Sequence, residues 1–233
     1  MAQKLQTIGF DADDTLWHNE RFFHLTQERF ADLLADHAAR DHLGERLLAA
    51  ETRNLGHYGF GVKGFVLSMI ETAIDVTKGQ VPGHVIGQIL EAGREMLDHP
   101  MELLPHAREA VEAVAASHHL VLITKGDLLH QERKLAQSGL GEHFDAVEIV
   151  SDKQPETYAR IFGTSPGGPG AAMMVGNSLK SDVRPAIDAG GWGVYVPHDL
   201  VWGFEHAEKP AHPRFVELPD LGGLCALVAD LDS

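Results

Sequence analysis

Acidic, hydroxyl, amide and basic side chains follow four apolar segments of this 233-residue chain. Short apolar segments of this kind are typical of buried parallel strands. The functional crevice of an open parallel sheet lies beyond the carboxyl ends of its strands. The sequence therefore predicts one polar site at that edge, built from Asp11, Asp13, Thr124, Lys153, Asn177 and Asp182.

Asp11 and Asp13 lie two residues apart in the run FDADDTL. In an extended segment this spacing puts both side chains on the same side. Two close carboxylates repel each other and favour a hard divalent cation with oxygen ligands, such as Mg²⁺. Phosphoryl transfer needs an in-line nucleophile, a proton donor and dense positive charge around the phosphate oxygens. This set of side chains suits that reaction.

The elements that must position these residues are predicted strands alternating with helices. An acid at Asp127 and a glycine at Gly139 bracket one helix, and Ser178 or Ser181 can cap another that stops at Gly190. This alternation predicts an α/β fold with a doubly wound parallel sheet. The strands are predicted at Leu5–Phe10, His119–Thr124, Ala146–Val150, Ala172–Val175 and Val194–Val196.

A long helical excursion separates the first two predicted strands. Residues 17–104 carry apolar side chains at helical spacing and few strand-like segments. We interpret them as an all-helical module, or cap, inserted into an α/β core of residues 1–16 and 105–233. The run Gly59–Gly64 matches GxGxxG but follows no apolar strand, so we interpret it as a cap loop that opens a helix at Phe65.

The polar runs also resemble the motifs of haloacid dehalogenase-like hydrolases, in order and over nearly the whole chain. FDADDTL resembles the first motif, DxDxT, and Thr124-Lys125-Gly126 resembles the second. Lys153 fits the third motif, a lone basic residue, and GNSLKSD resembles the fourth. The helical insertion is similar to the cap of one large subgroup, the helical-cap phosphatases.

The resemblance implies a role for each matching residue. Asp11 would attack phosphorus and form an aspartyl-phosphate, and Asp13 would protonate the leaving group and then deprotonate water. Thr124 would bind the phosphoryl oxygens, with Lys125 and Gly126 beside it, and Lys153 would neutralise charge. The cation would be held by Asp11, Asp13 through its main-chain carbonyl, Asn177 and Asp182.

The fourth motif departs from the family pattern, because Asn177 stands where members often carry an acid. An amide oxygen can still bind Mg²⁺, but with one negative charge fewer, so we expect weaker metal binding. Outside the motifs, Tyr58 and Lys63 at the tip of the cap loop and His18 after the first motif are predicted to face the substrate.

The composition restricts the partners. A formal net charge of −15 repels polyanions, so we expect a small phosphorylated metabolite rather than nucleic acid. The chain has one cysteine, and no apolar run approaches the roughly 20 residues of a membrane span. We therefore predict a cytoplasmic protein without membrane association. The oligomeric state cannot be predicted from the sequence.

Three other functions are compatible with parts of this pattern. A 2-haloacid dehalogenase would use Asp11 against carbon, but that branch commonly lacks the acid found here at Asp13. A sugar phosphomutase would pass the phosphoryl group to another hydroxyl, and the core motifs permit this. A phospho-receiver signalling module has a similar Asp, Thr and Lys set, but such modules are single short domains without an insertion of this size.

Overall fold

The computed structural model describes residues 4–200 and 202–233. The chain divides into two compact units. One, the core unit, comprises Met1–His18, Met101–Lys125 and Gln131–Ser233; the other, the helical unit, comprises Asn19–Pro100 and Gly126–His130. We predicted an inserted module of residues 17–104. The main segment of the helical unit, Asn19–Pro100, begins two residues later and ends four residues earlier. Residues 1–3 of the predicted core lie outside the described residues.

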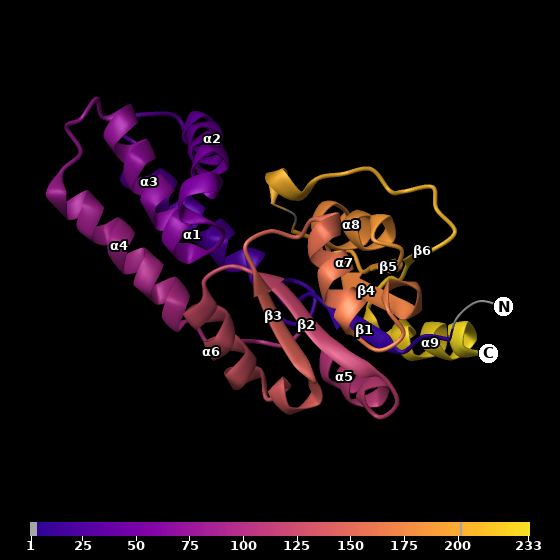
Figure 1. Ribbon diagram of the computed structural model, residues 1–233. Coiled ribbons are helices and arrows are strands. Elements are labelled where there is room, and N and C mark those ends of the chain that lie inside the picture. The colour runs from indigo at the N-terminus through magenta and orange to yellow at the C-terminus, as the bar shows by residue number, and fades with distance from the viewer. Residues whose placement is uncertain (1–3, 201) are drawn as a thin grey trace. The chain divides into compact units, whose positions relative to one another are not determined.

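Parallel strands form the centre of the core unit (Figure 1). In the described residues they make one six-stranded sheet of order β3-β2-β1-β4-β5-β6, and each neighbouring pair is parallel. The five predicted strands are confirmed, and the sixth, β6, was not predicted. The strands are β1 (Thr7–Phe10), β2 (His119–Lys125), β3 (Ala146–Val150), β4 (Ala172–Gly176), β5 (Trp192–Tyr195) and β6 (Phe215–Glu217).

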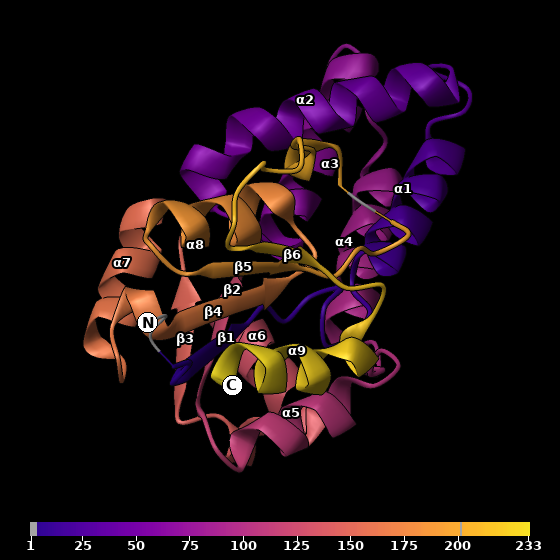
Figure 2. The ribbon, with the colours of Figure 1, turned by 90° about the vertical axis from the view of Figure 1, so that its right-hand side faces the viewer.

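Helices cover both faces of this sheet, as an α/β doubly wound fold requires. Leu120 and Leu122 of β2 belong to one apolar cluster, with α5 (Ala107–Ala115) and α9 (Leu224–Asp232). Val121 and Ile123 point the other way, into a cluster with α7 (Pro155–Thr164) and α8 (Arg184–Asp188). Figure 2 shows the two helix layers on opposite sides of the strands. The predicted fold class is confirmed.

Local signals in the sequence fix the helix ends near the site. The helix after β2, α6 (Leu128–Ser138), ends at Gly139, whose φ of 64° is the left-handed conformation that glycine adopts most easily. After β4 the chain makes a π-helical turn at Leu179–Val183, and the Ser178 side chain caps it by accepting a hydrogen bond from Ser181 N–H. Helix α8 follows with Pro185 in its first turn.

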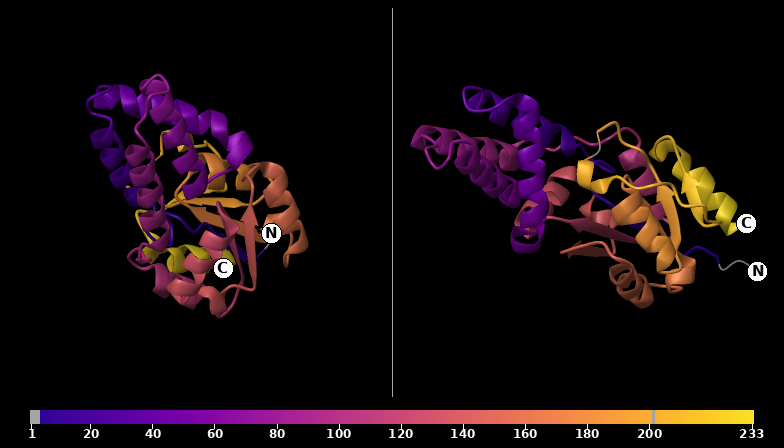
Figure 3. Two further views of the ribbon diagram at one scale, coloured as in Figure 1. Left: turned by 90° about the vertical axis from the view of Figure 1, so that its left-hand side faces the viewer. Right: turned by 90° about the horizontal axis from the view of Figure 1, so that it is seen from above.

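The helical unit has an apolar core of its own. Helix α2 packs on α3, α3 packs on α4, and α1 contacts both α2 and α4 (Figure 3). Buried side chains such as Phe30, Leu47 and Met69 form its interior. The helices are α1 (Glu20–Leu33), α2 (Arg40–Tyr58), α3 (Val62–Val76) and α4 (Gly83–Asp98).

The prediction that the third of these helices opens at Phe65 is wrong. Helix α3 begins three residues earlier, at Val62, because the turn from α2 needs only the three residues 59–61. Both glycines have positive φ values, 71° and 109°, which side chains rarely adopt. None of the helices in residues 4–200 and 202–233 has the length and apolar character needed to cross a membrane.

Candidate active site

Strand β1 delivers Asp11 to the carboxyl edge of the sheet. The Asp11 N–H donates to the carbonyl of Val175 in β4 at 2.9 Å, so its backbone continues the ladder. The chain then turns back, with Leu16 N–H donating to Ala12 O at 2.8 Å. The hydroxyl of Thr15 donates to Asp11 Oδ2 at 3.0 Å. Thr15 therefore orients the carboxylate from within the same loop.

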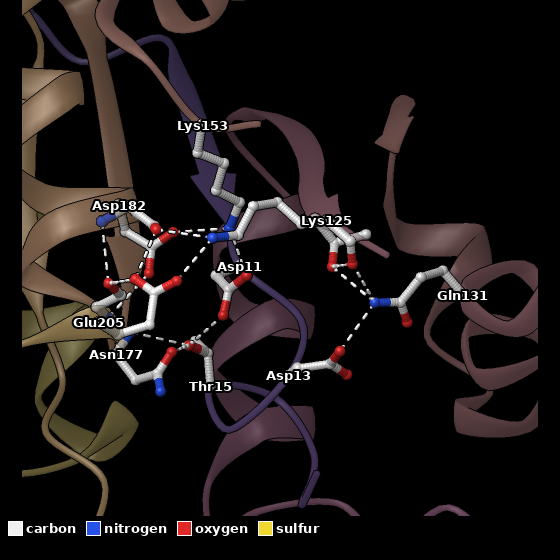
Figure 4. A network of polar contacts seen from close by, with 12 residues as sticks. Asp11, Asp13, Thr15, Lys125, Gln131, Lys153, Asn177, Asp182 and Glu205 are labelled. Atoms are coloured by element: carbon white, nitrogen blue, oxygen red, sulfur yellow. Dashed lines mark hydrogen bonds and ion pairs between the residues drawn. The ribbon is translucent and has the colours of Figure 1, made fainter. Parts of the chain in front are cut away.

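Lys153 joins two carboxylates at the centre of the site (Figure 4). Its ammonium lies 2.5 Å from Asp11 Oδ1 and 2.7 Å from Asp182 Oδ1. The three side chains are only 2%, 9% and 1% exposed, for Lys153, Asp11 and Asp182 in that order. The third and fourth motifs thus converge on the predicted nucleophile, as expected from the ends of neighbouring parallel strands.

This triad carries a net negative charge in a buried place. Burial raises the pKa of Asp11 to about 7, helped by the nearby Asp182 carboxylate and opposed by Lys153. Burial by itself would lower the pKa of Lys153, but the two carboxylates outweigh it and the pKa rises. Further positive charge at this point would keep Asp11 ionised at neutral pH.

The π-helical turn places Asp182 behind Lys153. Its Oδ2 accepts a hydrogen bond from Ser178 N–H at 2.9 Å, so both carboxylate oxygens have partners. A Cβ atom at Gly176 would lie 2.3 Å from that same Oδ2. Glycine is therefore required at this position of the fourth motif. Direct ligation of a cation by Asp182, predicted from the sequence, would have to share an oxygen with one of these donors.

Oxygen atoms from three residues face one another on the other side of Asp11. The end of the Asn177 side-chain amide that faces the site lies 3.2 Å from Asp11 Oδ2 and 3.3 Å from the main-chain O of Asp13. If this end is the amide oxygen, the three atoms form an acceptor cluster suited to Mg²⁺. If it is the NH₂ group, it donates to both neighbours instead. The residues therefore fit the implied cation, and in the other orientation the Asn177 NH₂ group occupies the position that the cation would take.

Asp13 belongs to a second polar cluster, reached from helix α6. Lys134 Nζ lies 2.6 Å from Asp13 Oδ1, and Gln131 Nε2 donates to Asp13 Oδ2 at 2.8 Å. The indole N–H of the buried Trp17 also donates to Oδ1, at 2.7 Å. Burial would raise the pKa of Asp13, but Lys134 and these hydrogen bonds outweigh it and lower the pKa. Asp13 is thus held as a carboxylate.

The second motif contacts the Asp13 cluster on one side and the fourth motif on the other. Thr124 is buried, and its hydroxyl accepts a hydrogen bond from Gln131 Nε2 at 3.0 Å. The next residue, Lys125, turns toward the fourth motif, where its ammonium donates to Ser181 Oγ at 2.8 Å and lies 2.7 Å from Glu205 Oε1. Glu205 also accepts hydrogen bonds from the hydroxyls of Ser178 and Ser181.

Comparison with known proteins agrees with this geometry. A family profile described as haloacid dehalogenase-like hydrolase matches residues 5–190. The chain belongs to the haloacid dehalogenase-like hydrolases. Among curated proteins, no relative matches.

Solved structures of this hydrolase family share the fold. A haloacid dehalogenase-like family hydrolase from Xanthomonas campestris is 43% identical over 99% of this chain and 93% of its own, with a TM-score of 0.89. The putative HAD-hydrolase YfnB from Bacillus subtilis, described as bound to magnesium, is 15% identical over 97% and 100%, with a TM-score of 0.69. The L-2-haloacid dehalogenase from Xanthobacter autotrophicus is 18% identical over 97% and 98%, with a TM-score of 0.64.

Three functional candidates of this hydrolase were missed by sequence reasoning. Gln131 and Lys134 are three residues apart on α6, a spacing that places both on one helix face. That spacing, just after the second motif, was an available signal. Glu205 lies in a short turn after β5, far from every motif, and no pattern in the sequence marks it.

Three predicted substrate contacts belong to the helical unit. Tyr58 is exposed, Gly126 has a φ of 125°, and the Lys63 ammonium lies 2.6 Å from Asp127 Oδ2. Their contribution to substrate binding stays a prediction. The other two predicted contacts, Lys125 and His18, belong to the core unit, where the His18 ring lies 5.9 Å from that of His198.

Proposed function

We propose that this hydrolase is a Mg²⁺-dependent phosphatase acting on small phosphate monoesters through an aspartyl-phosphate at Asp11. One observation carries the proposal: a second carboxylate, Asp13, is held by Gln131, which also holds the hydroxyl of Thr124. A reaction at phosphorus needs a second acid for the leaving oxygen, whereas a displacement of halide from carbon does not.

The chain's own residues divide the reaction between them. Asp11 Oδ attacks phosphorus as the bond to the ester oxygen breaks, and Lys153 offsets the charge on Asp11 and the phosphoryl oxygens. Thr124 donates its hydroxyl hydrogen to a phosphoryl oxygen. Asp11, the main-chain carbonyl of Asp13 and Asn177 would hold Mg²⁺, which would supply further positive charge for the anionic substrate. Its presence in the YfnB structure supports this choice of metal.

Asp13 performs both proton transfers in this proposal. It protonates the departing alkoxide, and in the second half-reaction it removes a proton from the water that attacks the aspartyl-phosphate. The ion pair with Lys134, at 2.6 Å, favours the ionised form and thus the second step. The first step needs the protonated form, so substrate binding must weaken the Lys134 contact before the leaving group departs.

Asn177 favours a second candidate, a metal-independent 2-haloacid dehalogenase. Its amide NH₂ can donate to Asp11 Oδ2 and the Asp13 carbonyl and so occupy the place of a cation. In that reaction Asp11 would displace halide from the carbon next to a carboxylate. We rank it second, because displacement of halide needs no second acid and gives Asp13, Gln131 and Thr124 no role in the reaction.

Release of inorganic phosphate from p-nitrophenyl phosphate tests the proposal. We expect turnover with Mg²⁺, loss of turnover in EDTA, and loss in Asp11→Asn. The matched control is Asp41→Asn, an exposed acid in the first turn of α2, which leaves turnover unchanged. Release of chloride from 2-chloropropionate in EDTA, without any phosphate release, would overturn the proposal in favour of the dehalogenase.

The physiological substrate class follows from the same reasoning. The formal net charge of −15 disfavours extended polyanions, so we propose a small phosphorylated metabolite encountered in the cytoplasm. A panel of such metabolites, ranked by kcat/KM, would identify it. Transfer of phosphate to a second hydroxyl of the substrate, instead of release, would point to a phosphomutase.

A further inference from the structure

A second group of metal-binding side chains lies beside the first motif and takes no part in the proposed chemistry. It consists of Asp14, His18 and His198, each of which offers one ligand atom within 4.8 Å of the other two. Asp14 and His18 flank the loop that follows Asp13, and His198 lies three residues after the end of β5. All three belong to the core unit.

The backbone holds these side chains in place. Asp14 has a φ of 61°, and its N–H donates to Trp17 O at 2.7 Å. His18 N–H donates to Glu102 O at 3.0 Å. The side chains of Asp14 and His198 are only 7% and 12% exposed. The first-motif loop and the segment after β5 therefore hold the three side chains at defined positions within the core unit.

The spacing of the ligand atoms fits a transition-metal ion. Asp14 Oδ1 and His198 Nε2 lie 3.6 Å apart, too far for a hydrogen bond. Ligands bound at 2.0–2.2 Å to a tetrahedral Zn²⁺ ion are about 3.3–3.6 Å from one another. This separation is therefore the one that two ligands of a common ion would have. The His18 ligand atom lies within 4.8 Å of both and would move closer to become the third.

The other ring nitrogen of His198 is oriented as in metal-binding histidines. Nδ1 lies 3.0 Å from Leu200 O, and in the other tautomer it accepts a longer hydrogen bond, of 3.3 Å, from Leu200 N–H. The shorter contact is a hydrogen bond only if Nδ1 carries the ring proton and donates it. The lone pair is then on Nε2, the atom that faces Asp14. A carbonyl that fixes the tautomer in this way is a frequent companion of metal-bound histidine.

We propose that Asp14, His18 and His198 form a binding site for a divalent transition-metal ion such as Zn²⁺, distinct from the cation site at Asp11. Two imidazole nitrogens and one carboxylate suit Zn²⁺ and its neighbours in the first transition row, whereas Mg²⁺ prefers oxygen ligands. Water would complete the coordination. The ion would tie the first-motif loop to the segment after β5.

Metal titration of the full-length, metal-free protein tests this site. We expect one equivalent of Zn²⁺ to bind in the presence of millimolar Mg²⁺, and Co²⁺ to give the visible absorption of a low-coordinate, nitrogen-bound ion. His198→Gln and His18→Gln each weaken Zn²⁺ affinity by at least about tenfold. The control His84→Gln, an exposed histidine of α4, leaves the affinity unchanged.

A measurement on the unaltered protein guards against variants that fail to fold. Nitrogen-15 spectra of the imidazoles should show the ring signals of His18 and His198 shifting together as Zn²⁺ is added, ahead of those of the other histidines. The proposal is overturned if Zn²⁺ does not bind, if it shifts other histidines first, or if excess Mg²⁺ displaces it. None of these readouts depends on phosphatase activity.

Discussion

Ion pairs in the core unit and in the helical unit differ in their access to water. In the core, Lys153 and its partners Asp11 and Asp182 are each less than a tenth exposed. In the helical unit, Arg29 and Glu95 form a pair at 2.6 Å, as short as the core pairs, with side chains 40% and 57% exposed. The interaction is chemically the same, but its energetic consequences are not.

Exposed pairs gain little, because water already solvates both charges and the side chains lose freedom in pairing. In the core, burial shields the charges from bulk water, so each charge depends on its neighbours. Two carboxylates face one ammonium there, which leaves an excess of negative charge that the proposed Mg²⁺ would offset. An ion pair therefore adds little to the stability of the helical unit, whereas in the core unit it holds charged side chains together in a buried site.

Removal of the central ammonium should have the largest effect. In Lys153→Met, two buried carboxylates repel each other without compensation, and we expect the free energy of unfolding at pH 8 to fall by about 3–5 kcal/mol. Arg29→Met, the matched change in the helical unit, should cost less than about 1 kcal/mol. Urea denaturation of both variants makes the measurement. Equal losses would remove the distinction between the two units.

Glu205 extends the comparison to a pair of intermediate burial. Burial would raise the pKa of Glu205, but Lys125 and two serine hydroxyls outweigh it and lower the pKa below its usual 4.5. A lowered carboxylate pKa stabilises the fold above pH 4.5, and the contribution disappears as the pH falls through the lowered value. We expect Glu205→Gln to cost about 1–3 kcal/mol at pH 7.

The stability difference between Glu205→Gln and the unaltered chain should shrink as the pH is lowered below 4.5, because both then carry a neutral side chain. Chemical denaturation at a series of pH values gives this curve. A difference that stays constant with pH would mean that the charge of Glu205 does not contribute, and that its hydrogen bonds to Ser178 and Ser181 account for the effect.

Placing an acid at position 177 should show how far the negative charge of the proposed cation site determines its affinity for Mg²⁺. Asn177→Asp adds a carboxylate beside Asp11 Oδ2 and removes the NH₂ group that can replace a cation. We expect Mg²⁺ to bind about tenfold more tightly by calorimetry, or about 1.4 kcal/mol. Gln80→Glu adds the same charge at an exposed position of the helical unit and should leave the affinity unchanged. Tighter binding in both variants would indicate a general charge effect.

The smallest effect is expected on the surface of α4. Arg94 pairs with Glu91 three residues earlier at 2.9 Å, and both side chains are exposed. Arg94→Ala should change the free energy of unfolding by less than about 0.5 kcal/mol. Thermal denaturation in low and high salt would show this. A larger loss of stability that disappears in high salt would contradict this expectation, because it would mean that an exposed ion pair stabilises the helical unit substantially.

The sequence predicted what depends on local pattern. Five strands and the motif residues at their ends follow from apolar runs and from the direction of a parallel sheet, and the structure brings Asp11, Lys153 and Asp182 together. The sequence could not predict contacts made by loop residues that the fold brings back to the site. Glu205 reaches Lys125 across 80 residues, and β6 is a three-residue edge strand without an apolar run.

The helical unit shows the same limit in another form. Its glycines at 59 and 61 were recognised as a loop, yet the start of α3 was misplaced because positive φ values cannot be read from the motif itself. In the core unit, the spacing of Lys134 from Gln131 indicates a shared helix face, but the 2.6 Å contact of Lys134 with Asp13 depends on the fold.

Phosphorylation of Asp11 is the central claim, and mass spectrometry of the acid-quenched enzyme tests it most directly. After rapid mixing with p-nitrophenyl phosphate and Mg²⁺, the peptide that contains Asp11 should gain the mass of one phosphoryl group, lost again when substrate is exhausted. Asp11→Asn should gain none. A phosphoryl group on any other residue, or turnover with Asp11 never modified, would contradict the account.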